Sequence, residues 1–281
     1  MKETILFTGK SGKVTNQDLD NAIRAIGAHD TDVLYIHTAM NFGTPTAMGK
    51  KELLESIYQV FESLAIPTLI FPTYTFSFCN GTSYDVQKTK TSMGILNDFA
   101  RQKHKAVRSV DPLMSNALIG KHTEFIDAIG KRSIGADSTF DLLHRTGLRV
   151  KFLFMGPRIG DCFTYMHYIE EQEGVPYRYN RKFKGEITNG DKTYTDEYEL
   201  FVRYSNVYPG PGTHVYGNIM FERNIAKGKR IGDSAIAVVD EKQAYACYVE
   251  LLKMSPSFYI KEVFDEADNT TEFLVKDMVA L

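Results

Sequence analysis

Three side chains that could transfer a proton follow a predicted buried strand. Thr164, His167 and Glu170 are spaced three residues apart, so on a helix they lie along one side. A carboxylate one turn after an imidazole can bind one ring nitrogen, which fixes the tautomer and leaves the other nitrogen free to take a proton. The strand before them, 152–155, ends at Gly156, and ligand sites of α/β proteins lie at the carboxyl ends of strands. The spacing therefore predicts an acid/base pair at the edge of a sheet.

Two other interpretations of this stretch stay open. A His-x-x-Glu spacing is also common on solvated helix faces, where it has no chemical role. His and Glu at this spacing can share a zinc ion, but that needs a third ligand. The sequence contains neither a His-Glu-x-x-His nor a Cys-x-x-Cys pattern, the usual sources of such ligands. We therefore expect no metal.

The composition narrows the class of protein. The chain has 281 residues, of which 43% are hydrophobic and 24% charged, enough for one large domain with a sizeable core. A formal net charge of -2 gives no reason to expect nucleic acid or an anionic membrane as a partner. Three scattered cysteines suit a reducing compartment. No apolar run approaches the ~20 residues of a membrane span. We expect a cytoplasmic protein without membrane insertion.

Strand-like and helix-like stretches alternate between residues 33 and 170. The hydrophobic patterns predict strands at 33–37, 68–71 and 152–155, and helices at 16–26, 49–64, 93–102, 121–129 and 137–145. Such alternation predicts a largely parallel sheet with helices on both faces.

The pattern changes after residue 180. Asn189-Gly190 between two alternating stretches predicts a β-hairpin with strands at 183–188 and 193–203. Further strands at 221–225 and 235–239 and a helix at 242–252 complete an α+β portion. We expect a single domain over 1–281, with an α/β core (1–180) and this C-terminal portion (181–281), which would shape the acceptor site.

Polar loops follow the predicted strands. His37-Thr38-Ala39 ends the first strand, Tyr74-Thr75 follows the second, and residues 108–115 carry Arg, Ser and Asp side chains. A strand, a polar loop and then a helix N-terminus can bind phosphate or a polarised carbonyl. The alternative for the loop after His37 is an ordinary βα connection, and for residues 108–115 it is a surface turn with an Arg108–Asp111 pair.

In this order, the segments resemble those of the aminoglycoside 3-N-acetyltransferases and their relatives. The matching segments are His37-Thr38-Ala39-Met40, Pro72-Thr73-Tyr74-Thr75, Thr89-Lys90-Thr91-Ser92-Met93-Gly94, Arg108 to Ser115, Thr164 to Glu170, and Pro176-Tyr177-Arg178. They span roughly residues 30 to 205. The resemblance implies an α/β/α sandwich of the antibiotic-acetyltransferase type and transfer of an acyl group from coenzyme A to an amine.

The resemblance also implies roles for individual residues. His167 would be the general base, Glu170 would support it, and Asp111 would be a further catalytic carboxylate. The residues expected to bind the coenzyme are His37, Thr38, Ala39, Arg108, Ser109 and Ser115. Those expected to bind the acceptor are Tyr74, Thr75, Thr164, Glu171, Tyr177 and Arg178. The implied cosubstrate is acetyl-CoA or another short-chain acyl-CoA.

Departures from the family pattern bear on the acceptor, a small-molecule amine. Asp111 stands where the family has His, and Ala39 where it has a second Ser. The net charge is near neutral, whereas enzymes that bind polycationic drugs tend to be acidic. These departures favour the relatives that N-acylate nucleotide-linked amino-dideoxy sugars for surface polysaccharide, with Asp111 contacting the sugar amine or sharing the base role. An aminoglycoside acetyltransferase conferring antibiotic resistance is the alternative, and a homodimer is also open.

Other function classes compete with this interpretation. A metal hydrolase would use His167, Glu170 and Glu171, and a non-catalytic relative would bind coenzyme A or a nucleotide as a regulator. Cys162, close in sequence to His167, could be a nucleophile. We expect it to pack as a small hydrophobe instead, because an amine attacks a thioester without an acyl-enzyme.

Overall fold

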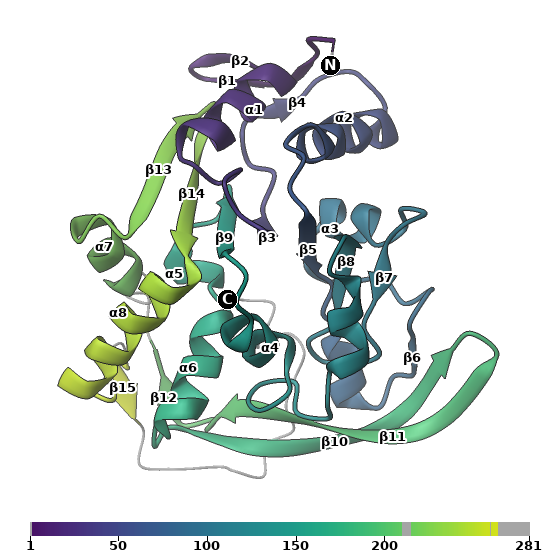
Figure 1. The fold of residues 1–281 in the computed structure, drawn as a ribbon, viewed down its shortest axis with the longest axis vertical. Coiled ribbons are helices and arrows are strands. Elements are labelled where there is room, and N and C mark those ends of the chain that lie inside the picture. Colours follow the sequence, from purple (N-terminus) through teal and green to yellow (C-terminus); the bar gives the residue numbers. More distant parts are fainter. Residues whose placement is uncertain (1, 210–214, 259, 264–281) are drawn as a thin grey trace.

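A seven-stranded sheet organises the protein in the computed structural model (Figure 1). The structure describes residues 2–209, 215–258 and 260–263. The strand order is β13-β14-β9-β3-β5-β8-β7. In that order the strands span Ala226–Ile231, Ser234–Asp240, Val150–Met155, Val33–Thr38, Thr68–Pro72, Asn116–Gly120 and Val107–Arg108.

Parallel pairing is confined to the centre of this sheet. β3 runs parallel to both β9 and β5, whereas β14, β13, β8 and β7 all pair antiparallel to their neighbours. The sheet is therefore mixed rather than largely parallel, because the β13-β14 hairpin from the C-terminal portion joins it beside β9 and the antiparallel strands β8 and β7 join it beside β5. The predicted α/β/α class is confirmed.

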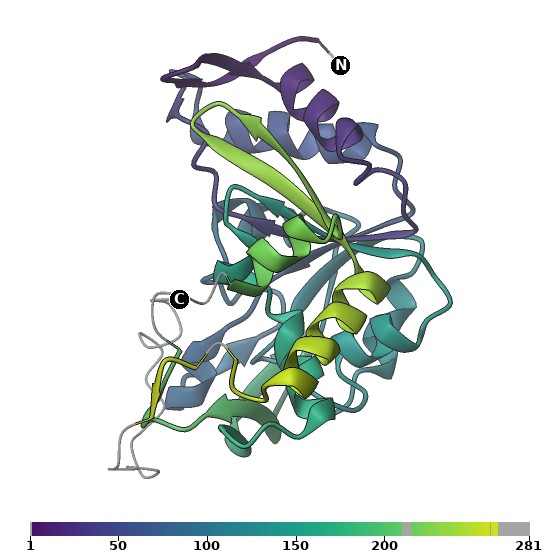
Figure 2. The same cartoon turned by 90° about the vertical axis from the view of Figure 1, so that its left-hand side faces the viewer.

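Successive side chains of β3 point to opposite faces of the sheet, and each face packs into its own hydrophobic core. Leu34 and Ile36 belong to one buried cluster, and Val33 and Tyr35 belong to the other, as the two-residue period of a strand requires. The Leu34 face is covered by α1 (Asn16–Ala25), α2 (Lys50–Ser63) and α3 (Ile95–Ala100). The Tyr35 face is covered by α4 (Thr139–Arg145), α6 (Tyr165–Glu173), α7 (Val215–Glu222) and α8 (Glu241–Met254). Figure 2 shows these layers from the side.

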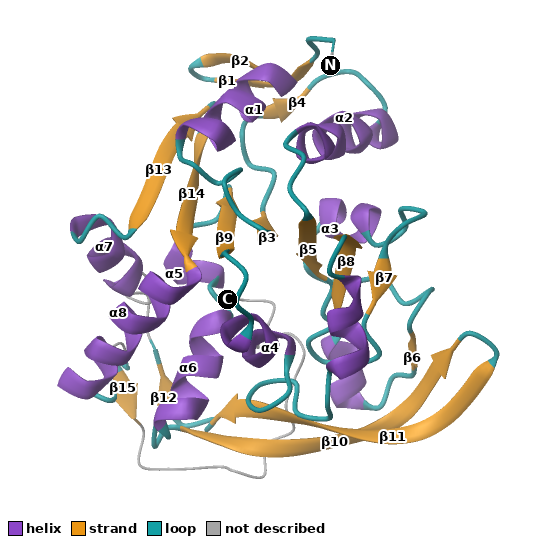
Figure 3. Ribbon diagram, in the orientation of Figure 1, coloured by secondary structure: helices purple, strands orange, loops and turns teal. Residues whose placement is uncertain are grey.

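A long hairpin forms one edge of the Tyr35 face (Figure 3). β10 (Arg178–Asn189) and β11 (Lys192–Arg203) pair residue for residue, and β6 (Tyr84–Asp85) adds to β10 in parallel. The turn falls at Gly190, which has a φ of +60°, a conformation that glycine adopts at low cost. The predicted hairpin is confirmed, and its first strand begins earlier than predicted, directly after α6.

Two predicted elements are wrong. The expected strand at 221–225 is the end of α7 and the turn after it, where Asn224 takes a φ of +57°; the strand β13 begins only at Ala226. The expected helix at 121–129 is a 3₁₀ helix, Thr123–Ala128, and none of its residues is buried. Without a buried face, little packing energy is available to hold a longer α-helix there.

The remaining short elements complete the chain. They are β1 (Ile5–Gly9), β2 (Gly12–Thr15), β4 (Thr44–Pro45), a 3₁₀ helix at Phe76–Asn80, α5 (Ile159–Cys162), β12 (Val207–Tyr208) and β15 (Glu262–Val263). Residues from both sides of position 180 share the Tyr35-face core; the division there stays a prediction, and residues 264–281 of the C-terminal portion lie outside the described residues. None of the helices described is long and apolar enough to cross a bilayer.

Phe152 tests how the Tyr35-face core holds α6 on the sheet. Its ring is fully buried and lies 4.9 Å from the Tyr165 ring and 5.1 Å from the Phe163 ring, centroid to centroid. Phe152→Ala should lower the free energy of unfolding by about 3–5 kcal/mol, measured by urea titration. Tyr194→Ala, which removes a 37% exposed ring, is the control and should cost far less. Equal losses would contradict this account of the core.

Candidate active site

Glu170 is the centre of the candidate site. Its side chain is fully buried, and each carboxylate oxygen has two partners. Oε2 lies 2.8 Å from His167 Nδ1 and 2.7 Å from Arg178 Nε. Oε1 accepts hydrogen bonds from the hydroxyls of Tyr177 at 3.0 Å and Tyr248 at 3.1 Å. A buried carboxylate is stable only when it is paired and hydrogen-bonded in this way.

Local chain geometry brings three of these partners together. His167 and Glu170 are one turn apart on α6, which ends at Gly174 with a φ of +66°. The backbone N–H groups of Gly174 and Val175 donate to the Glu170 carbonyl, so the chain reverses and runs back along the helix. Tyr177 and Arg178 therefore return to the carboxylate that precedes them by seven and eight residues.

The fourth partner comes from a distant part of the chain. Tyr248 lies on α8, is fully buried, and reaches Glu170 across the α6–α8 contact. Sequence reasoning missed this residue. Its only signal is its place on the apolar side of a predicted helix, which many core residues share.

The imidazole of His167 is held between the buried Glu170 carboxylate and the protein surface. Its side chain is 22% exposed, whereas Glu170 is not exposed at all, so the ring spans the boundary between core and solvent. Burial first, and the Arg178 guanidinium next, lower the pKa of His167 below its ordinary value, while Glu170 acts in the opposite direction. A carboxylate can only accept from Nδ1, so with Nδ1–H donated to Glu170 the second ring nitrogen, Nε2, is the one able to accept a proton.

Asp111 is buried in a separate hydrogen-bond network from Glu170. Its Oδ1 accepts from the Ser133 hydroxyl at 2.8 Å and from the backbone N–H groups of Leu113 and Met114 at 2.9 and 3.3 Å. Burial raises the pKa of Asp111 to about 6, against the lowering effect of these hydrogen bonds and of Lys131. None of its hydrogen bonds reaches His167 or Glu170, so its predicted catalytic role stays a prediction.

The expected acceptor residues lie in four different settings. Tyr177 and Arg178 contact Glu170, as described above. Tyr74 donates to or accepts from the Tyr35 hydroxyl at 2.6 Å; burial raises its pKa, and hydrogen bonds with Tyr35 and Thr164 oppose that rise. Thr75 instead donates to the Pro112 carbonyl at 2.5 Å.

Glu171 points away from this arrangement. It forms an ion pair with Arg132, which also contacts Glu199 of β11 at 3.0 Å, so it links α6 to the long hairpin.

Arg108 is built into the fold. Its five N–H donors meet the Thr73 hydroxyl and carbonyl, the Val86 and Thr89 carbonyls and the Ser115 hydroxyl, at 2.6 to 3.3 Å. Ser115 also donates to the Thr73 carbonyl, and the Ser109 hydroxyl accepts from the Asn116 backbone. The structure thus ties these three residues to the ends of β5 and β8. A phosphate contact from Arg108 would require one of those bonds to open.

The loop after β3 presents a different set of contacts. His37 is buried, stacks on Phe154 with the ring centroids 5.2 Å apart, and has its pKa lowered to about 3 by burial. The Thr38 hydroxyl donates to the side chain of Asn97 at 2.8 Å, and the Ala39 N–H donates to the Met155 carbonyl.

A cavity of about 410 Å³ lies beside this loop. Its lining includes Lys50 of α2, Lys90, Thr91, Ser92 and Gly94 of the loop before α3, and Ile95, Asp98 and Phe99 of α3, so α2, α3 and the Thr89–Gly94 loop form its walls. A Cβ on Gly94 would come within 3.5 Å of the Thr38 hydroxyl, so the loop after β3 lies next to this cavity. Lysines and hydroxyls are suitable partners for phosphate groups.

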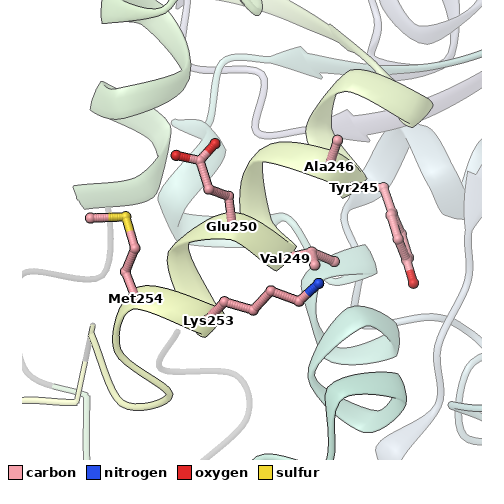
Figure 4. Close-up of a pocket in the computed structure, with 6 residues that line it drawn as sticks. All are labelled: Tyr245, Ala246, Val249, Glu250, Lys253 and Met254. Atoms are coloured by element: carbon pink, nitrogen blue, oxygen red, sulfur yellow. The ribbon is translucent and has the colours of Figure 1, made fainter.

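A larger hollow of about 540 Å³ lies elsewhere, along α8 (Figure 4). All six labelled residues, from Tyr245 to Met254, come from that one helix. Within the part of the chain that the structure describes, the lining of this hollow includes none of the predicted site residues.

The structure also bears on the two rival mechanisms, a metal site and a nucleophilic cysteine. Within the described residues, no group of three or more His, Cys, Asp or Glu side chains is arranged to hold a metal ion. Burial raises the pKa of the Cys162 thiol well above its ordinary value, which disfavours the thiolate that a nucleophile requires.

A partly exposed imidazole bound to a buried carboxylate on α6 has the components of an acid/base pair. The family model described as aminoglycoside 3-N-acetyltransferase matches residues 36–253. The chain therefore belongs to the aminoglycoside 3-N-acetyltransferase family. This membership confirms the predicted class, an acyl-CoA-dependent N-acetyltransferase with acetyl-CoA as cosubstrate.

Solved structures share this fold at low identity. An aminoglycoside acetyltransferase AAC(3)-Xa superposes with a TM-score of 0.71 and 18% identity over 85% of this chain and 93% of that one. The complex titled "AAC-IIIb binary with CoASH" has a TM-score of 0.70 and 17% identity, over 85% and 96%. The YokD protein from Bacillus subtilis has a TM-score of 0.71 and 15% identity, over 87% and 95%. Among curated proteins, no sequence matches this chain.

Asp111 gives a pH-dependent prediction. Its folded pKa of about 6 lies above the unfolded value of about 3.9, so its stability contribution is full below about pH 4 and is lost as pH rises through about 6. Asn cannot ionise, and its oxygen can accept the same three hydrogen bonds. The stability of Asp111→Asn relative to the wild type should therefore rise by up to about 3 kcal/mol between pH 4 and pH 7.

Urea unfolding at pH 4, 5, 6 and 7 measures this difference. Asp191→Asn, the same chemical change on the exposed hairpin turn, is the matched control. A constant difference between Asp111→Asn and the wild type across this range would show that Asp111 is charged throughout.

Proposed function

We propose that this protein transfers the acetyl group of acetyl-CoA to an amine of an aminoglycoside, with His167 as general base and Glu170 as its orienting partner. The observation that carries the proposal is the His167–Glu170 pair, with Nδ1 bound to a buried carboxylate at 2.8 Å and the ring partly exposed. The family membership supplies the reaction class. A similar structure is titled "AAC-VIa bound to Sisomicin", which supports an aminoglycoside acceptor.

The chemistry demands little of the base. An amino-sugar ammonium with a pKa of about 8 is roughly one-tenth deprotonated at pH 7, a deficit of about 1.4 kcal/mol. His167 Nε2 takes the amine proton as the C–N bond forms and passes it to the sulfur as the C–S bond breaks. Holding the amine beside the thioester can contribute up to ~7–11 kcal/mol, so positioning accounts for the larger share of catalysis.

The cavity between α2 and the Thr89–Gly94 loop suits the coenzyme. Lys50 and Lys90 would bind its phosphates, and the Ser92 hydroxyl would donate a hydrogen bond, whereas the Thr91 and Thr38 hydroxyls already donate to the Tyr74 carbonyl and to Asn97. This assignment moves the phosphate contacts away from Arg108, whose donors already have partners within the fold. His37 and Ala39 would then shape the loop rather than contact phosphate.

A nucleotide-linked amino sugar is the second candidate acceptor. The cations beside the base favour it: Arg178 and Arg203 both act on His167. These cations would oppose a polycationic drug more than an acceptor that carries a diphosphate. The sequence also predicts this acceptor, although the similar structures described above name aminoglycoside enzymes.

Substitutions at His167 and Cys162 distinguish general-base catalysis by the histidine from nucleophilic catalysis by the cysteine. His167→Ala should lower kcat/KM by about 10²–10⁴-fold, the usual contribution of a general base, whereas Cys162→Ala should keep most activity. Release of free thiol from acetyl-CoA, followed with a thiol reagent, measures both. If Cys162→Ala were inactive and His167→Ala active, the base assignment would be reversed in favour of a nucleophilic cysteine.

The acceptor is tested with the same assay. Sisomicin and a thymidine-diphosphate amino-dideoxy sugar are supplied in parallel at equal concentration, with His167→Ala as the control. We expect turnover on the aminoglycoside. Turnover on the nucleotide sugar alone would select the second candidate, and no thiol release with either acceptor would contradict both.

A further inference from the structure

We propose that Arg178 is a positioning residue that holds His167 as the neutral tautomer, with the proton on Nδ1 and the lone pair on Nε2. The inference rests on the proposed function, because it concerns the base of that reaction. It gives Arg178 a different role from the acceptor contact predicted from the sequence.

The geometry places one guanidinium against both members of the pair. Arg178 Nε lies 2.7 Å from Glu170 Oε2, the same oxygen that binds His167 Nδ1. Arg178 Nη2 lies 3.5 Å from His167 Nε2. The side chain of Arg178 is only 10% exposed, so its charge acts through a medium with little solvent screening.

A guanidinium carries only hydrogen-bond donors. At 3.5 Å from Nη2, a lone pair on Nε2 is attracted, whereas an N–H at Nε2 would meet another donor. The contact is long for a hydrogen bond, so its main effect is electrostatic. It disfavours both the Nε2–H tautomer and the doubly protonated ring.

The shared oxygen explains why Glu170 does not reverse this effect. A carboxylate beside an imidazole normally stabilises the charged ring. Here Oε2 is divided between His167 and Arg178, and Oε1 is occupied by Tyr177 and Tyr248. Glu170 therefore orients the ring while Arg178 offsets part of its charge.

The charged groups acting on His167 come from three elements. Glu170 belongs to α6, Arg178 to β10 and Arg203 to β11, and only Glu170 favours the protonated ring. A base in this setting releases an acquired proton readily, which suits a residue that must pass it on to the departing sulfur within the same reaction.

Nitrogen NMR of the ¹⁵N-histidine-labelled protein tests the inference without any acceptor. In the wild type at pH 7, we expect Nε2 of His167 to be unprotonated and Nδ1 to carry the hydrogen, with the signals assigned by their absence in His167→Gln. In Arg178→Gln, the titration midpoint of His167 should rise by about 1–3 pH units, the effect of removing a like charge at this distance.

Two variants serve as comparisons. Lys182→Gln removes the same charge from an exposed position on β10, where Lys182 pairs with Glu197, and should leave the midpoint unchanged. Arg178→Lys retains the charge and should stay closer to the wild type than Arg178→Gln. If Arg178→Gln does not fold, the titration midpoint of His167 in Arg178→Lys is compared with that of the wild type instead.

An Nε2–H tautomer in the wild type would overturn the inference. So would an unmoved midpoint in Arg178→Gln, or equal shifts in Arg178→Lys and Arg178→Gln. Failure of the proposed function would be seen separately, as absence of thiol release in the acceptor assay with the wild-type protein.

Discussion

The burial of one carboxylate constrains the whole region around α6. An ionised Glu170 with no exposed surface must find several donors, since an uncompensated buried charge costs several kcal/mol. The fold supplies them from α6 itself, from the start of β10 and from α8. Burial of Glu170 therefore depends on three features of the fold: the turn at Gly174, the start of the long hairpin and the packing of α8 against α6.

The same constraint links stability to chemistry. Each group that stabilises Glu170 also limits how His167 can turn, because both share the carboxylate. The imidazole is preorganised by interactions formed on folding, so a base at this position would need little reorganisation when a substrate binds. The neighbouring polar arrangements around Arg108 and Tyr74 follow the same rule: their donors and acceptors are matched within the strand ends, which keeps the loops above the sheet fixed.

The sequence predicts the parts of this arrangement that depend on local spacing. His167 and Glu170 could be paired because three residues make almost one helical turn, and the hairpin because Asn-Gly suits its turn. Tyr248 could not be found, since it lies 78 residues from Glu170 and no period connects them. Arg108 looks like a phosphate ligand in sequence, but its actual partners are carbonyls and hydroxyls of segments that meet only in the folded sheet. The extent of parallel pairing was overestimated for a similar reason: strand alternation does not reveal that β13 and β14 join the same sheet.

The tyrosine on α8 has a consequence for synthesis. A chain still being translated can form the central strands and α6 before residue 248 has left the ribosome. At that stage Glu170 lacks one of its donors, and the helix that covers it is missing. The nascent protein is thus expected to acquire its central strands before the Glu170 carboxylate has all of its donors, so the His167–Glu170 pair would reach its final setting only after α8 has emerged.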